Sequence, residues 1–223
     1  MGIKENLEGI RKQIERSAGQ CGSRAEDIVL VGISKNFSLR QINEALACGL
    51  RDIGENRVQE AERKFPCIAN ARKHFVGHLQ GNKAKRAVEI FDMIQAVDSF
   101  KIARKISVAA LETGKRMPVL IQIKTDEKKQ FGILPAEAGA FLREAAQLEG
   151  IGISGLMTIG PEFEKPEASR PVFRQMKKLF DAVREKKIRG VEMRYLSMGM
   201  SSDFAIAIEE GANMVRVGRA LFG

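Results

Sequence analysis

Cysteine, histidine and tryptophan are scarce in this chain of 223 residues. The three cysteines, Cys21, Cys48 and Cys67, are odd in number, lie far apart and form no C-x-x-C pair. This pattern argues against a disulfide framework and against a zinc site. His74 and His78 are the two imidazoles of the chain, and they lie in a strand-like segment where a spacing of four does not bring side chains together. We therefore expect no metal centre.

Long apolar runs are also missing. No segment of the sequence is long and apolar enough to cross a bilayer, and residues 1–9 contain no apolar stretch of the secretory-signal type. Together with the cysteine usage, this favours a cytoplasmic protein with no membrane partner.

Aromatic residues of the kind that stack on nucleic-acid bases are few, with one tyrosine and no tryptophan. The formal net charge of +9 would suit a nucleic acid, but the basic residues are scattered over predicted helix faces and turns, among acidic ones. No segment combines aromatic and basic side chains as RNA-binding modules do. We expect no nucleic-acid partner; the alternative predicts salt-dependent retention of DNA or RNA. A positive field also suits a small phosphorylated ligand.

Apolar and helical patterns alternate along the chain. The first twenty residues carry apolar side chains at helical spacing and predict an amphipathic helix. Residues 28–34 form a continuous apolar run typical of a strand buried on both faces. Helical segments separate this run from further predicted strands at 51–55, 74–78, 93–99, 118–124, 153–160, 193–199 and 214–218.

This order predicts an α/β fold: a parallel (β/α)8 barrel of the TIM type with an extra N-terminal helix, in a single domain over residues 1–223. An open doubly wound sheet is the alternative. Against it, no G-x-G-x-x-G motif follows the first strand, and Lys35 stands where that motif would begin.

The carboxyl ends of the strands carry the active sites of such barrels, so Lys35 is a candidate functional residue. Its amine follows a buried strand and could condense with an aldehyde. The alternative is a lysine whose amine extends to solvent.

Glycine and serine follow the last two predicted strands. Residues 199–202 are predicted to begin a helix, with Asp203 in its first turn, and Gly218 and Arg219 to begin a short terminal helix. Loops at these positions of a barrel often bind phosphate through backbone N–H groups, to which Ser201 could add a hydroxyl and Arg219 a charge. An ordinary serine cap and glycine turn are the alternative. An amine opposite a phosphate cradle predicts pyridoxal 5′-phosphate (PLP); a Schiff-base aldolase acting on sugar phosphates would use the same features.

The motifs of this chain resemble those of the pyridoxal phosphate homeostasis protein family, which is similar to the N-terminal barrel domain of alanine racemase. The resemblance runs from about residue 5 to the end and is carried by GISK, GLRDIGENRVQEAERK, HFVGHLQGNKAK, GLMTIGP, LSMGMSSDF and VRVGRALFG. It implies that Lys35 carries PLP as an internal aldimine, that Ser201 and Gly218 belong to the phosphate site, that Arg216 faces the pyridine nitrogen and that Asn56 lies near the ring. His78, Ser197 and Arg219 complete the set predicted to bind the cofactor, and no catalytic residue is predicted.

The resemblance also implies a function: to buffer PLP inside the cell or to hand it to PLP-dependent apoenzymes. Because a guanidinium donates and does not accept, Arg216 would keep the ring nitrogen unprotonated and the cofactor a weak electron sink. Racemisation by two bases needs a second base, and the single tyrosine, Tyr195, is expected to pack inside the barrel. We expect a monomer that is not an enzyme; weak racemase or lyase activity is the alternative.

Two positions depart from the family pattern. Many relatives continue from the SK motif toward a proline, whereas Asn36, Phe37 and Ser38 follow here, which predicts a more mobile loop. Relatives often have a threonine at the position of Arg219, whose backbone N–H could still bind phosphate.

Overall fold

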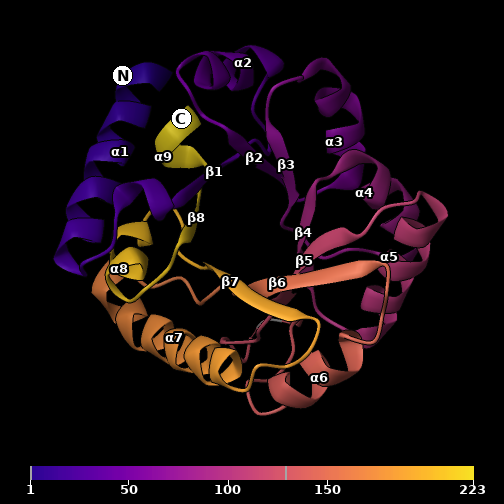
Figure 1. The fold of residues 1–223 in the computed structure, drawn as a ribbon. Coiled ribbons are helices and arrows are strands. Elements are labelled where there is room, and N and C mark those ends of the chain that lie inside the picture. Colours follow the sequence, from indigo (N-terminus) through magenta and orange to yellow (C-terminus); the bar gives the residue numbers. More distant parts are fainter. Residues whose placement is uncertain (1, 129) are drawn as a thin grey trace.

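In the computed structural model, which describes residues 2–128 and 130–223, eight parallel strands close into a barrel. Figure 1 shows the strands as an inner ring with the helices outside it. The strands are β1 (Val29–Ile33), β2 (Asp52–Glu55), β3 (Arg72–Phe75), β4 (Met93–Val97), β5 (Met117–Gln122), β6 (Ile151–Met157), β7 (Val191–Ser197) and β8 (Met214–Val217). The predicted fold class is confirmed.

Helices follow the strands in regular alternation, after one leading helix. They are α1 (Ile3–Gln20), α2 (Leu39–Ala47), α3 (Val58–Lys64), α4 (Ala84–Ile90), α5 (Phe100–Glu112), α6 (Ala138–Ala145), α7 (Arg170–Glu185), α8 (Phe204–Glu209) and α9 (Arg219–Phe222). Serine caps two of these helices: Ser38 accepts from the N–H of Gln41 at the start of α2, and Ser99 accepts from that of Ile102 at the start of α5. No helix of the described residues has both the length and the hydropathy to span a membrane.

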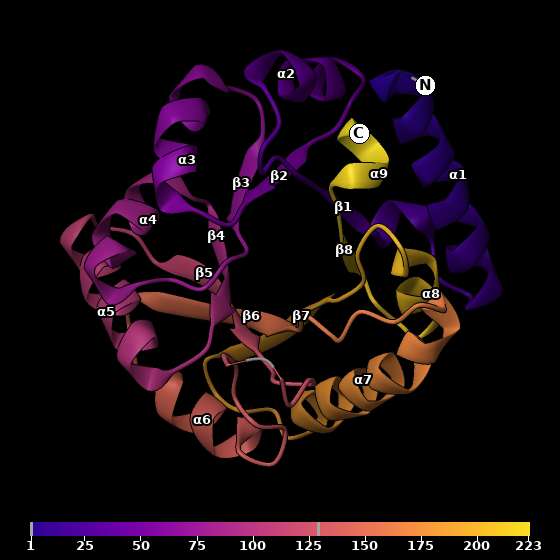
Figure 2. The ribbon, with the colours of Figure 1, turned by 180° about the vertical axis from the view of Figure 1, so that it is seen from behind.

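The barrel closes where β1 pairs with β8. Val31 is in register with Asp52 on β2 and with Arg216 on β8, so β1 has a parallel partner on each side. Helix α1 lies beside α9 in both views of the ring (Figures 1 and 2). The Asn6 side chain donates to the carbonyl oxygen of Leu221 at 3.1 Å and joins these two helices.

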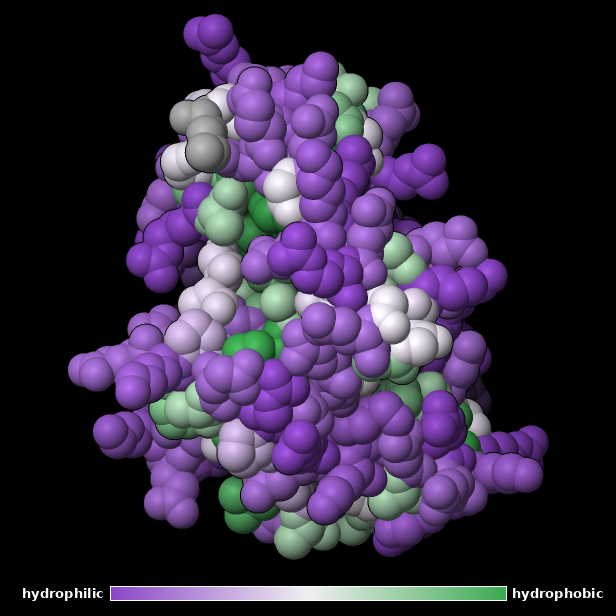
Figure 3. All heavy atoms as spheres, turned by 90° about the vertical axis from the view of Figure 1, so that its left-hand side faces the viewer, coloured by the Kyte–Doolittle hydropathy of each residue, from purple (hydrophilic) through white to green (hydrophobic). Residues whose placement is uncertain are grey.

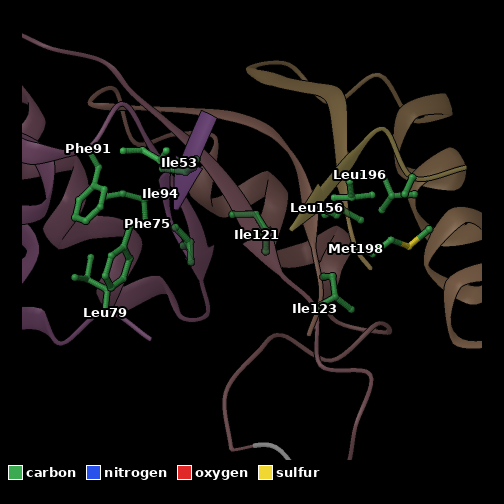
Figure 4. Packing of buried hydrophobic residues seen from close by; sticks show 14 of the residues in the cluster. Ile53, Phe75, Leu79, Phe91, Ile94, Ile121, Ile123, Leu156, Leu196 and Met198 are labelled. Carbon is green, nitrogen blue, oxygen red and sulfur yellow. The ribbon is translucent and has the colours of Figure 1, made fainter. Parts of the chain in front are cut away.

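Apolar side chains form two layers. The larger lies between the strands and the outer helices, where Phe91 packs edge-on against Phe65 and against Phe75. Figure 4 shows Phe91 beside Phe75 in this layer. The smaller fills the barrel interior and contains Val31, Met93, Ala96, Leu120, Met157, Tyr195 and Met214. Tyr195 is 8% exposed, which confirms its expected packing in the barrel. Hydrophilic side chains dominate the outer face shown in Figure 3.

Two predicted boundaries are wrong. Strand β3 ends at Phe75, so His78 lies in the following loop and not within the strand. Helix α8 begins at Phe204, so Asp203 precedes it and is not in its first turn. The Asp203 carboxylate accepts the N–H of Met200 at 2.7 Å, and this bond closes a turn before the helix starts.

Candidate functional site

Lys35 lies just beyond the carboxyl end of β1, and its side chain is half-buried. Its Nζ atom has no hydrogen bond or ion pair with any residue that the structure describes. The nearby Lys64 differs, because its Nζ donates to the carbonyl oxygen of Ser34 at 2.9 Å and pairs with Glu60. Of these two amines, that of Lys35 is the one free to react with a ligand.

The segment after Lys35 is anchored at two points. Asn36 has a φ of +65°, in the left-handed region that asparagine tolerates better than most residues, and its N–H donates to Oε1 of Glu60 at 2.9 Å. Phe37 contacts Phe222 of α9, with ring centroids 5.0 Å apart. The sequence predicts a mobile loop here, whereas the structure ties it to α3 and α9.

Two carboxyl groups near this segment, those of Glu55 and Glu60, have pKa values shifted in opposite directions. Glu55 is fully buried, and burial raises the pKa of its carboxyl, with the negative charge of Glu60 adding to the effect. Burial would also raise the pKa of Glu60, but hydrogen bonds from Lys64 and a backbone N–H, with the charge of Lys64, lower it overall. Glu55 also accepts from the Ser34 hydroxyl at 3.3 Å, so this charged cluster supports the backbone next to Lys35.

The loops after β7 and β8 meet at Ser201. Its Oγ accepts from the backbone N–H of Gly218 at 3.3 Å and from that of Ala220 at 3.5 Å. The backbone N–H groups of Ser201, Ser202 and Arg219 donate to no acceptor in the described part of the chain. Two loops distant in sequence thus present unpaired donors at the carboxyl end of the barrel, as an anion requires.

Gly199 gives the loop after β7 its shape. Its φ is +88°, and a Cβ at this position would lie 2.6 Å from Cβ of Ala207 and 2.9 Å from Cα of Phe204. Glycine is therefore required here for its conformation and for the close approach of α8.

Arg216 is buried inside the barrel, with 4% exposure. Its Nη1 donates to Oγ of Ser197 at 2.6 Å, and its Nη2 donates to the carbonyl oxygen of Thr158 at 2.7 Å. Burial lowers the pKa of the guanidinium to about 10, and the charge of Asp203 opposes this shift. Arg216 therefore stays a cation at neutral pH.

Asn56 and His78 line a common cavity of about 480 Å³, together with Glu60 and several basic side chains. The Oδ1 atom of Asn56 is buried and has no hydrogen-bond partner among the described residues. Nδ1 of His78 lies 2.6 Å from Oδ2 of Asp98, and its ring stacks on Phe131 with centroids 3.6 Å apart.

The structure brings the sequence-derived candidates together in part. Its contacts join Arg216 to Ser197, and Ser201 to Gly218, while Asn56 and His78 share the cavity. Lys35 is linked to that cavity through its neighbour Asn36. The N–H of Asn36 donates to the carboxylate of Glu60, and Glu60 lines the cavity. The Arg219 side chain is exposed and makes no hydrogen bond or ion pair with a described residue.

Sequence reasoning missed several residues behind this site. Gln95 on β4 accepts a hydrogen bond from the Ser197 hydroxyl. The sequence presents His74 only as a candidate metal ligand, whereas in the structure it bonds to Gln95 and Asp52. The available signal was a glutamine within the apolar run of β4, since a polar residue in a buried strand requires a partner.

Comparison with known proteins relates the chain to a family over nearly its whole length. The model of the alanine racemase N-terminal domain family matches residues 6–223. The pyridoxal phosphate homeostasis protein of Aquifex aeolicus strain VF5 is 34% identical over 226 residues, which cover 100% of this chain and 98% of the relative.

Solved structures agree. PipY of Synechococcus elongatus PCC7942, determined with PLP bound, has 36% sequence identity and a TM-score of 0.87, over 99% of this chain and 100% of PipY. Alanine racemase of Clostridium difficile 630 has 17% identity and a TM-score of 0.79, over 100% of this chain and 56% of the racemase, and shows a shared fold alone. With a full-length barrel, these motifs and these relatives, the chain belongs to the pyridoxal phosphate homeostasis protein family, which shares the alanine racemase N-terminal domain.

Proposed function

We propose that this chain binds PLP at the carboxyl end of the barrel through a covalent link to Lys35, and that it serves PLP homeostasis. Family membership and the PLP-bound structure of PipY support the ligand. The observation that carries the assignment within this chain is the Lys35 amine, which has no partner among the described residues, beside a strand end in a barrel of this family. A free amine is what an aldehyde cofactor requires.

Three features of the chain fit the chemistry of this cofactor. The unpaired N–H groups of Ser201, Ser202 and Arg219 suit a phosphate dianion. The buried Oδ1 of Asn56, which lacks a partner in the described chain, could accept from the ring hydroxyl. The Arg216 cation suits an unprotonated pyridine nitrogen, because it can only donate. These features also support Ser197 and Gly218 as members of the site, through their bonds to Arg216 and Ser201.

Each residue then has a defined task. PLP supplies an aldehyde whose carbon forms a C=N bond with an amine, with loss of the aldehyde oxygen as water. Lys35 provides that amine, and Glu60 holds the neighbouring backbone in place. Ser201 orients the two phosphate loops against each other, and Arg216 keeps a proton away from the ring nitrogen. His78, fixed by Asp98, borders the cavity and would limit the access of water to it.

We propose a carrier of PLP and not a racemase. Tyr195 lines a cavity with Val29, Arg72 and Asn213, which lie at the amino ends of their strands or just before them. It therefore lies at the end of the barrel opposite to Lys35, where it cannot act as a second base. Racemisation of L-alanine at a rate no higher than that of free PLP is expected; turnover well above it would favour the racemase alternative.

The test of the binding proposal is a visible absorption spectrum of the protein with PLP, followed by borohydride reduction and peptide mass mapping. We expect an absorption band that borohydride bleaches, and a pyridoxyl group on the peptide that contains Lys35. Lys35→Ala should lose the adduct and keep cooperative unfolding. Lys124→Ala is the matched control, because Lys124 follows the carboxyl end of β5 and is also half-buried. A protein that stays colourless with added PLP would contradict the proposal, and trapping of a sugar phosphate without PLP would then test the aldolase alternative.

We further propose that residues 1–223 act as a single PLP-binding domain, as a cytoplasmic monomer that gives PLP to apoenzymes and has no nucleic-acid or membrane partner. Light scattering during gel filtration tests the monomer. Transfer is tested by mixing the PLP-loaded protein with an apo-aminotransferase and following recovery of its activity against an equal amount of free PLP. Recovery no faster than the spontaneous loss of PLP from the carrier would mean release into solution and not delivery.

A further inference from the structure

A continuous chain of buried polar side chains crosses the interior of the barrel. It runs from Arg216 and Ser197 near the carboxyl ends of β8 and β7, through Gln95 of β4 and His74 of β3, to Asp52 at the start of β2. Ser197, Gln95 and His74 are fully buried, and Arg216 and Asp52 are 4% and 6% exposed. Polar groups buried to this degree are costly unless each is paired, so their pairing is informative.

Every neighbouring pair in this chain is hydrogen-bonded. Oγ of Ser197 lies 2.6 Å from Nη1 of Arg216 and 2.7 Å from Oε1 of Gln95. Nε2 of Gln95 lies 3.0 Å from Nδ1 of His74 and 3.2 Å from Sδ of Met214. Nε2 of His74 lies 2.8 Å from Oδ1 of Asp52, which also pairs with Nε of Arg72 at 3.0 Å.

Arg216 and Asp52, at the two ends of this series of polar side chains, determine which group donates and which accepts in every bond between them. Arg216 can only donate, so Oγ of Ser197 accepts from it and gives its one proton to Gln95. The amide NH₂ group of Gln95 must then face His74, whose Nδ1 accepts. The remaining ring proton of His74 lies on Nε2 and is donated to the Asp52 carboxylate, which can only accept. The tautomer of His74 thus follows from a guanidinium three hydrogen bonds away.

Reversal of one link would leave buried groups mispaired. A proton on Nδ1 of His74 would oppose the NH₂ group of Gln95, and rotation of that amide would turn its donors toward Ser197, whose hydroxyl would lose its acceptor. The Met214 sulfur would lose its donor as well. Such a network is satisfied in one arrangement and therefore behaves as a unit.

We propose that Gln95 and His74 are positioning residues that hold the guanidinium of Arg216 in the orientation with which it meets the pyridine nitrogen of bound PLP. This inference rests on the proposed function for its ligand. The donor-to-acceptor direction of the hydrogen bonds from Arg216 to Asp52 can nevertheless be tested without PLP. Ser197 and the Thr158 carbonyl engage both terminal nitrogens of Arg216, and Gln95 and His74 keep Ser197 in the state that accepts from it.

The first test is ¹⁵N NMR of the two histidines in the protein without PLP. We expect His74 as the neutral Nε2–H tautomer with a slowly exchanging ring proton. His78 is the internal reference: its Nδ1 faces the Asp98 carboxylate, which can only accept, so its ring proton lies on Nδ1 and not on Nε2. His74→Asn assigns the signals. A His74 that carries its proton on Nδ1, or on both nitrogens, would overturn the one-way chain.

The second test replaces Gln95 by leucine, with Gln122→Leu as the matched control. Gln122 is also a buried glutamine of a barrel strand, but its amide donates to the Phe131 carbonyl, outside the chain. Gln95→Leu should change the His74 tautomer ratio in the free protein, shift the absorption band of bound PLP and raise its Kd about ten-fold. Gln122→Leu should leave the His74 signals and the band unchanged.

Equal effects of the two substitutions on the band, or an unchanged His74 spectrum in Gln95→Leu, would refute the positioning role. If Gln95→Leu does not fold, Gln95→Glu serves instead: its carboxylate would accept from His74 and should place a proton on Nδ1, visible in the same spectrum. Failure of the wild-type protein to bind PLP would refute the proposed function, while the histidine spectrum would still decide the direction of the chain.

Discussion

Oγ of Ser201 lies 3.3 Å from the backbone nitrogen of Gly218 and accepts its hydrogen bond. One hydroxyl therefore joins the loop after β7 to the loop after β8, and both loops carry N–H groups without an acceptor among the described residues. The relative position of these donors depends on a bond that one substitution removes.

Ser201→Ala should raise the Kd for PLP about ten-fold and leave the stability of the fold nearly unchanged, because it removes a single hydrogen-bond acceptor at a half-buried site. Spectral titration with PLP measures the effect. Ser202→Ala is the control, since Ser202 is exposed and its hydroxyl bonds to none of the described residues. Equal affinities of the two variants would remove Ser201 from the phosphate site.

Gly199→Ala should destabilise the protein by about 2–4 kcal/mol, because it combines a positive φ with a Cβ pressed against the α8 backbone. Gly114→Ala is the control that measures the cost of a positive φ without a steric contact. Gly114 has a φ of +66°, but a Cβ there would meet nothing within 4 Å, so about 1 kcal/mol is expected. Urea unfolding gives the free energy of unfolding of both variants. Similar decreases in the two would mean that α8 moves away from the added Cβ at little cost.

Glu60→Gln should lower stability by about 1–2 kcal/mol at pH 7, because it removes an ion pair with Lys64 and weakens the hold on Asn36. The folded pKa of Glu60 lies below its usual 4.5, so its contribution is present above pH 4.5 and is lost as pH falls through the folded pKa. The difference from the wild type should therefore narrow on acidification below pH 4.5.

Glu55→Gln is the control, because the pKa of Glu55 is shifted in the opposite direction to that of Glu60. The folded pKa of Glu55 lies above 4.5, so its contribution is fully present below pH 4.5 and is lost as pH rises through the folded pKa. The wild type should gain stability relative to this variant as pH falls. Parallel pH profiles of the two variants in urea unfolding would contradict the assigned electrostatics.

Arg170→Met should destabilise the protein by about 1–3 kcal/mol, because Arg170 bonds to Glu167, Glu209 and Glu210 and ties the start of α7 to the end of α8. The exposed Arg184, which pairs with Asp181, provides the control Arg184→Met, for which less than about 1 kcal/mol is expected. Thermal unfolding measures the loss of stability in both variants. High salt should reduce the loss for Arg170→Met, because salt weakens the attraction within the Arg170 cluster. A loss for Arg170→Met no greater than that for Arg184→Met would show that the cluster does not stabilise α8.

The sequence predicts well what is encoded locally. Ser38 and Ser99 are residue types that favour helix starts, and both accept a hydrogen bond from an N–H group in the first turn of the helix that follows. Lys35 stands out as a candidate because a charged residue ends an apolar run, and the strand count followed from the alternation of patterns.

Contacts between strands are harder to predict, because they depend on register and on barrel closure. Gln95 and His74 meet across β4 and β3, and Ser197 joins them from β7. Neither their spacing nor their flanking residues indicate this meeting. The anchoring of Asn36 likewise depends on Glu60, which lies on a different element of the barrel.

The pairing of β1 with β8 has a consequence for biosynthesis. While the ribosome makes the chain, β1 can pair with β2 early, but its other edge must wait until Met214–Val217 leave the exit tunnel. Until then the nascent barrel is an open sheet with exposed edges, and Ser201 has no Gly218 to bond. The two loops that we propose to hold the phosphate therefore form together with ring closure, and on this proposal PLP can bind only after translation has passed the last strand.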